Sequence, residues 1–68
     1  MTNTEELREH IISSGVSITF LAEKLGITRE CFYKKLNNVT EFKASEIMKC
    51  SRLLHLSDDE RDRIFFAR

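Results

Sequence analysis

The sequence has no proline and no tryptophan, and only two glycines and two cysteines among its 68 residues. Proline and glycine are the residues that most often interrupt helices, so their scarcity favours a chain of helices broken at few positions. Cys31 and Cys50 are too far apart for a CxxC metal or redox site. With no sign of export, we expect both thiols to be reduced and packed as buried filler rather than joined in a disulfide.

Long hydrophobic runs are also missing, since the uninterrupted apolar stretches are only a few residues long. A membrane-spanning helix needs about 20 predominantly apolar residues, so we expect no membrane partner. The first segment, "MTNTEELREH", has neither the basic region nor the apolar region of a signal peptide. A cytoplasmic location is therefore expected.

Catalytic and metal-binding patterns are absent too. His10 and His55 stand without a cysteine or carboxylate at ligand spacing, and no glycine-rich phosphate loop or Ser/His/Asp set is present. The acidic run at 58–60 suits the start of a helix, where carboxylates oppose the helix dipole. A chain this short buries only roughly 60% of its unfolded surface, which leaves little room for an enclosed cleft. We expect no enzyme activity, metal, cofactor or small-molecule substrate.

The formal net charge of zero conceals an uneven distribution. Residues 1–27 carry two cations and four anions, and residues 53–68 carry three cations and four anions. Residues 28–52 carry six cations against three anions. This excess predicts a local positive surface on an otherwise neutral protein.

The remaining pattern predicts five short helices and no strand, so the expected fold class is all-α. Gly15 and Gly26 are suited to the left-handed residue that ends a helix. Thr2 or Thr4 is the expected N-cap of the first helix, and the last two helices are expected at about 44–54 and 58–66. The other expected helix caps are Ser17, Thr28, and Ser57 with Glu60 as a capping box. The positions expected to face inward are Leu7, Ile11, Ile12, Phe20, Leu21, Ala22, Leu25, Ile27, Phe32, Leu36, Ile47, Met48, Cys50 and Leu54.

The stretch "LAEKLGITRECFYKKLNN", residues 21–38, has the form helix, tight glycine turn, helix. Offsets along its second helix place five polar side chains on one outward stripe: Arg29, Glu30, Tyr33, Lys34 and Asn37. Arg and Lys donate to guanine, Asn pairs with adenine, and Glu accepts from cytosine. Tyr33 is suited to a sugar or a thymine methyl. The stripe therefore fits the major groove of DNA, although a charged face that only keeps a short helix soluble remains the alternative.

The segment "SITFLAEKLGITRECFYKKLNN" resembles the helix-turn-helix of the XRE/Cro family, especially compact phage and prophage repressors of Gram-positive bacteria. The later "FKASEIMKCSRLLHLSDDERDRIFF" is similar to the tail of those proteins, and together the match covers about residues 7–66. The resemblance implies one lambda-repressor-like domain over 1–68, with the helix-turn-helix at about 17–37. It also implies a Cro-like regulator that inserts helix 28–37 in the major groove of double-stranded DNA, as a homodimer on a palindromic operator.

The family pattern and the outward stripe together define the expected contacts. The base-reading residues are expected to be Thr28, Arg29, Glu30, Tyr33, Lys34 and Asn37. The phosphate contacts are expected at Ser17, Thr19, Lys35, Asn38, Lys43 and Ser45. Two positions depart from the family: Lys35 stands where an apolar residue is common, with its inward role expected to shift to Leu36. Asn38 replaces the usual glycine and tolerates the same left-handed backbone.

The chain end offers a second surface. Ile64, Phe65 and Phe66 cannot all face one small core, because consecutive helical residues diverge by about 100°. The residues expected at a dimer contact are Leu53, Leu56, Phe65 and Phe66, unless both phenylalanines pack across the first helix instead. A protein-interaction module of antirepressor or antitoxin type, built on the same fold, is the competing function, and the neutral net charge favours it.

Overall fold

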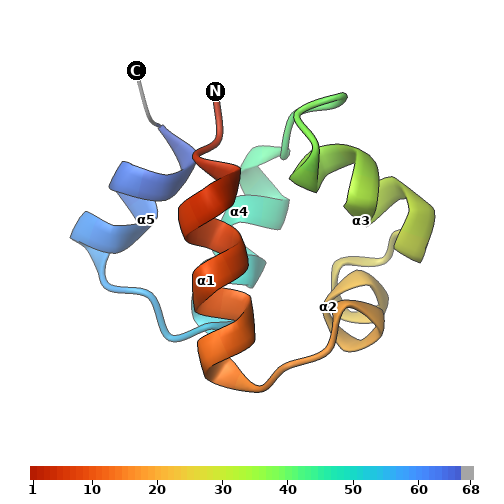
Figure 1. Cartoon of the computed structure of the whole chain (residues 1–68), viewed down its shortest axis with the longest axis horizontal. Helices are drawn as coiled ribbons and strands as arrows, with labels where there is room; N and C mark the ends of the chain where they lie inside the picture. Colours follow the sequence, from red (N-terminus) through yellow and green to blue (C-terminus); the bar gives the residue numbers. More distant parts are fainter. Residues whose placement is uncertain (67–68) are drawn as a thin grey trace.

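The computed structural model describes residues 1–66. Its helices are α1 (Thr4–Ser14), α2 (Ile18–Leu25), α3 (Arg29–Leu36), α4 (Ala44–Leu53) and α5 (Asp58–Phe65). In Figure 1, α1 stands in front of α4, with α5 on one side and α2 and α3 on the other. No strand occurs within residues 1–66, so the all-α class is confirmed. The last two residues of the expected 1–68 domain lie outside the described part.

Four of the helices within residues 1–66, α1, α2, α3 and α5, begin where a short polar side chain accepts a backbone N–H. Ser17 and Thr28 cap α2 and α3 as predicted, accepting from the backbone N–H three residues later at 3.0 and 3.1 Å. Ser57 and Glu60 form the predicted capping box of α5. The expectation for α1 was wrong, because Asn3, and not Thr2 or Thr4, accepts from the N–H of Glu6 at 3.2 Å. Among residues 1–66, no helix combines the length and apolar character that crossing a membrane demands.

The helix ends use four residues with a left-handed backbone. Gly15 and Gly26 do so at φ values of 74° and 75°. Asn38 (φ 58°) ends α3 as predicted, and His55 (φ 55°), another non-glycine residue with a positive φ, ends α4. The N–H of Leu56 donates to the carbonyl of Ser51 at 2.9 Å, and that of His55 to Arg52 at 3.2 Å, so α4 ends in a Schellman motif.

Replacing His55 by glycine is expected to stabilise the protein by about 0.5–1 kcal/mol. A side chain at a left-handed position costs about 1–2 kcal/mol, and the greater freedom of unfolded glycine offsets part of that gain. For a domain of this size the midpoint of thermal unfolding should rise by roughly 2–8 °C, as measured by circular dichroism. His55→Ala is the control, because it removes the imidazole but keeps the strained Cβ. Equal shifts for both variants would rule out backbone strain as the cause.

The core joins residues from every helix and from the α3–α4 loop. The buried hydrophobic side chains are Leu7, Ile11, Leu21, Ala22, Leu25, Phe32, Leu36, Phe42, Ile47, Cys50, Leu54, Ile64 and Phe65. The loop residue Phe42 makes edge-to-face contacts with Phe32 and Phe65, at ring-centroid distances of 5.8 and 5.3 Å. This aromatic row ties α3 to α5 through a segment that is not helical.

Several core predictions were wrong. Ile12, Phe20 and Met48 were expected inside but are exposed, Ile12 by 79%. In each case the neighbouring position takes the inward direction, because a short helix with partners on one side buries only a narrow stripe. Cys31, expected as buried filler, is exposed, whereas Cys50 is buried as expected and burial raises the pKa of its thiol to about 12.

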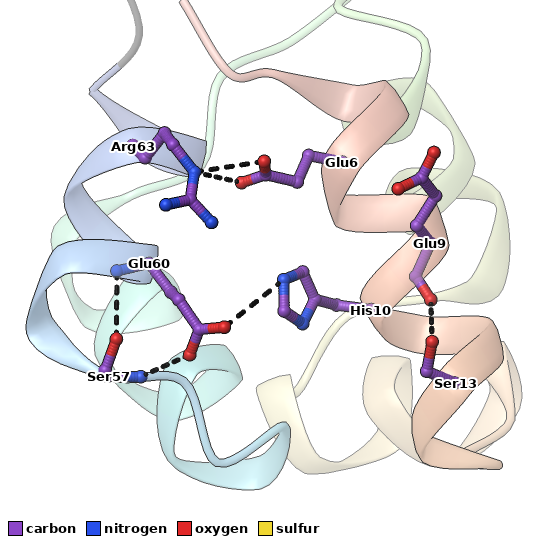
Figure 2. Close-up of polar contacts among 7 residues, drawn as sticks. All are labelled: Glu6, Glu9, His10, Ser13, Ser57, Glu60 and Arg63. Atoms are coloured by element: carbon purple, nitrogen blue, oxygen red, sulfur yellow. Dashed lines mark hydrogen bonds and ion pairs between the residues drawn. The ribbon is translucent and has the colours of Figure 1, made fainter.

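Polar contacts fasten α5 to α1, as Figure 2 shows. The Nε of Arg63 lies 3.0 and 2.9 Å from the two carboxylate oxygens of Glu6, and His10 Nε2 lies 3.7 Å from Glu60. The backbone N–H of Ser57 holds the pKa of the Glu60 carboxyl below its usual value. Most charged side chains on α5 therefore form ion pairs within α5 or with α1.

Candidate nucleic-acid interface

Three residues, Gly26, Ile27 and Thr28, connect α2 to α3, and the backbone fixes them closely. The N–H of Ile27 donates to the carbonyl of Ala22 at 3.0 Å, and that of Gly26 to Glu23 at 3.1 Å. Ala22 is buried, and α2 and α3 pack against each other. Because these hydrogen bonds hold the short turn in one conformation, the direction of α3 is set by the packing of α2.

The outer side of α3 carries most of the predicted base-reading residues. Thr28, Arg29, Glu30, Tyr33 and Lys34 are all exposed, while Phe32 and Leu36 are fully buried on the opposite side. Within residues 1–66, the side chains of Arg29 and Lys34 have neither a hydrogen bond nor an ion pair. Thr28 differs, because its hydroxyl already accepts from the N–H of Cys31. Two cations on a rigid helix are therefore available to an external acceptor.

Asn37 lies at the end of α3 and is already engaged. Its side-chain oxygen accepts from Arg8 Nη2 at 2.8 Å, and the same nitrogen lies 3.3 Å from the carbonyl of Leu36. A cation at this place also opposes the negative end of the α3 dipole. Sequence reasoning missed Arg8 because nothing local links residues 29 positions apart.

The structure shows that the prediction for Lys35 as a phosphate contact was wrong. It was expected to contact phosphate, but it is buried between α3 and α4. Its Nζ lies 3.2 Å from Glu46 Oε1, donates to the carbonyl of Glu41 at 3.0 Å, and sits 5.8 Å from the Phe42 ring centroid. Lys35 thus points inward together with Leu36, the residue that was expected to take the inward role. It is excluded from the candidate interface.

The side chains at the other predicted phosphate contacts are exposed, but two of them already make a hydrogen bond within the protein. Ser17 Oγ accepts from Phe20, and Asn38 Nδ2 donates to the carbonyl of Thr2 at 3.3 Å. Thr19, Lys43 and Ser45 make no side-chain hydrogen bond or ion pair within residues 1–66. Lys43 is the strongest remaining candidate because it alone of these three carries positive charge.

Ion pairing divides the surface into two parts. On the α5 side, Arg61 and Arg63 pair with Asp58, Asp62 and Glu6. Of the described cations on α2, α3, α4 and the loop between α3 and α4, only Lys35 has an ion pair. The cations that have none are Lys24, Arg29, Lys34, Lys43, Lys49 and Arg52. Most of the cations that the sequence places in residues 28–52 therefore lie at the surface without an ion pair in the described part of the chain.

The described residues contain no cluster of three or more His, Cys, Asp or Glu side chains that could hold a metal ion. A scan of the chain against protein-family models finds no match, and a search of curated proteins finds no similar protein either.

Proposed function

We propose that this chain is a sequence-specific DNA-binding transcriptional regulator, a Cro-like repressor of phage or prophage type. In this proposal α2 and α3 act as a helix-turn-helix of a lambda-repressor-like domain, and α3 enters the major groove. The observation that carries the proposal is the outer face of α3, where Arg29 and Lys34 have no partner within the described residues and lie beside the half-exposed Tyr33. Base reading needs donors held in a fixed direction, and the buried side of α3 supplies that rigidity.

In this function Arg29, Glu30, Tyr33 and Lys34 read bases, and Thr28 and Asn37 add base contacts at the two ends of α3. Phosphate contacts are assigned to the exposed side chains around it, chiefly Thr19, Lys43 and Ser45. With about three to five phosphates neutralised per protomer, log K should fall with log salt with a slope of about −3 to −4.5.

A single half-site of this size binds weakly, so we propose a homodimer on a palindromic site with half-site centres roughly 34 Å apart. Phe66 suits the contact because it is exposed on a hollow of about 450 Å³ that Phe42, Ile47 and Met48 also line. Leu56 is only half-buried and stays in the proposed contact, whereas the half-buried Leu53 lines a different hollow together with Lys24, Lys49 and Arg52. Phe65 does not, because it is buried against Phe42.

Selection of bound sites from a random DNA pool, followed by replacement of Arg29 with alanine, tests base reading. Arg29→Ala is expected to cost about 1–3 kcal/mol on the selected site and to relax the preference at one base pair. The measurement is fluorescence anisotropy on the selected duplex and on single-base variants of it. The half-site spacing among the selected duplexes reports on the dimer.

Two further variants distinguish the loss of a base contact from the loss of a phosphate contact and from the loss of a remote charge. Lys43→Ala should weaken all duplexes equally and reduce the salt slope by about one, because a phosphate contact carries no sequence information. Arg63→Ala should leave binding unchanged, since Arg63 lies on α5 and pairs with Glu6. If Arg29→Ala lowers binding to selected and random DNA by the same factor, Arg29 does not read a base.

A protein-interaction module is the second candidate, favoured by the same apolar hollow and by the zero net charge. Heparin chromatography separates the two. Retention at low salt with release at moderate salt supports DNA binding, whereas elution in the void volume together with a tight complex with a defined protein supports the second candidate.

A further inference from the structure

A small hollow between α2 and α4 brings three cations together. Its lining residues are Lys24 from α2 and Lys49, Arg52 and Leu53 from α4, and its volume is about 170 Å³. None of these residues belongs to the α3 face or to the contacts assigned around it. The hollow is thus a separate positive feature of the surface.

The three cations are not neutralised within the described part of the chain. Lys49 and Arg52 have no side-chain hydrogen bond or ion pair there, and Lys24 contacts only the ring of Phe20, 5.4 Å from its centroid. The acid best placed along α4 to pair with Lys49 is Glu46, three residues earlier. Its carboxylate is buried, where it pairs with Lys35 and accepts from the backbone N–H of Lys43. The three cations therefore have no anionic partner within the described residues, and an external anion can supply one.

We infer that this hollow is a binding site for a phosphate group. The guanidinium of Arg52 donates in a planar fork that matches phosphate oxygens, and the two lysines add charge and further donors. The half-buried side chain of Leu53 forms part of the wall of the hollow and excludes water from that side. Excluding water strengthens the electrostatic attraction between the cations and a bound phosphate group. The volume equals that of about five or six water molecules, so the hollow accommodates one phosphate group with some of its water rather than a whole nucleotide.

The phosphate group has two sources, inorganic phosphate from solution and the backbone of a nucleic acid, and two titrations separate them. Backbone amide shifts are followed by NMR at constant ionic strength with inorganic phosphate, and with a duplex of random sequence. Saturable shifts at Lys24, Lys49, Arg52 and Leu53 are expected in at least one titration, and the responding titration identifies the source. Since inorganic phosphate acts without DNA, failure of base reading at Arg29 leaves this test intact.

Lys49→Gln and Arg52→Gln should each weaken phosphate affinity by about tenfold, as expected when a charge-assisted hydrogen bond is lost. Arg63→Gln, which removes an exposed cation of α5 that lies outside the hollow and outside the proposed DNA contacts, should leave inorganic phosphate binding unchanged. Amide spectra of the free variants verify that they are folded. The inference is overturned if both titrations give only linear shifts equal to those with chloride, if acetate saturates the same amides equally well, or if Arg63→Gln weakens inorganic phosphate binding as much as Lys49→Gln does.

Discussion

Replacing Lys35 by methionine is expected to lower the free energy of unfolding by about 3–5 kcal/mol, because the change leaves the Glu46 charge unpaired inside the protein. The two side chains are only 9% and 8% exposed, and their charged atoms are 3.2 Å apart. The loss also removes the donor to the carbonyl of Glu41. A domain of this length has a total stability of roughly 3–10 kcal/mol, so the variant should be close to unfolding at room temperature. Urea unfolding followed by circular dichroism measures the effect.

Lys34→Met is the matched control, because Lys34 is the neighbouring lysine, exposed and without an ion pair among the described residues. Its effect on stability should stay within about 0.5 kcal/mol. The double variant Lys35→Met with Glu46→Leu should recover much of the loss, since an apolar pair often replaces a buried ion pair without net cost. Recovery should be incomplete because the N–H of Lys43 loses its acceptor. A loss below about 1 kcal/mol for Lys35→Met alone would contradict burial of the pair.

Replacing Phe32 by alanine is expected to cost about 3–5 kcal/mol, through lost burial and the cavity left behind. Phe32 is fully buried and makes an edge-to-face contact with Phe42. Its removal also loosens the link between α3 and α5, because Phe42 in turn contacts Phe65. Phe32→Leu keeps most of the volume and should cost less than about 1.5 kcal/mol. Chemical denaturation of both variants gives the comparison.

The adjacent Tyr33 should behave in the opposite way. It is 45% exposed, so Tyr33→Ala should change stability by no more than about 1 kcal/mol. On the proposed function it should nevertheless weaken binding to the selected DNA site. Phe32→Leu, if it stays folded, should bind with nearly unchanged preference. Should Tyr33→Ala bind the selected site as tightly as the unchanged protein, Tyr33 would not belong to the interface.

The predictions that succeeded concern interactions within one turn of helix. Ser17, Thr28 and Ser57 each bond a backbone N–H three residues ahead, and Gly26 and Asn38 each relieve strain at one position. Such contacts depend on neighbouring residues alone, so residue type and spacing are sufficient to predict them. The same local sequence patterns predicted the bounds of all five helices to within about two residues.

The predictions that failed concern direction across the core. Ile12 and Met48 are apolar but point to solvent, because their helices have partners on another side. Lys35 was placed at the surface on account of its charge, and it is instead buried against Glu46 and Phe42. A charged residue is rarely buried unless paired, so its burial depends on a partner eleven residues away that the local pattern does not reveal.

By itself, the sequence determined the five helices, the N-caps of α2, α3 and α5, and the concentration of positive charge in the middle of a neutral chain, since each follows from residues close together. Only the tertiary structure decided which of those charges remain available. Packing joins Lys35 to Glu46, Arg8 to Asn37 and Arg63 to Glu6, and it leaves Arg29, Lys34 and the three cations between α2 and α4 without ion pairs in the described chain. The physical reason is that pairing requires two side chains within about 4 Å, and only the packing of helices brings distant parts of a chain so close.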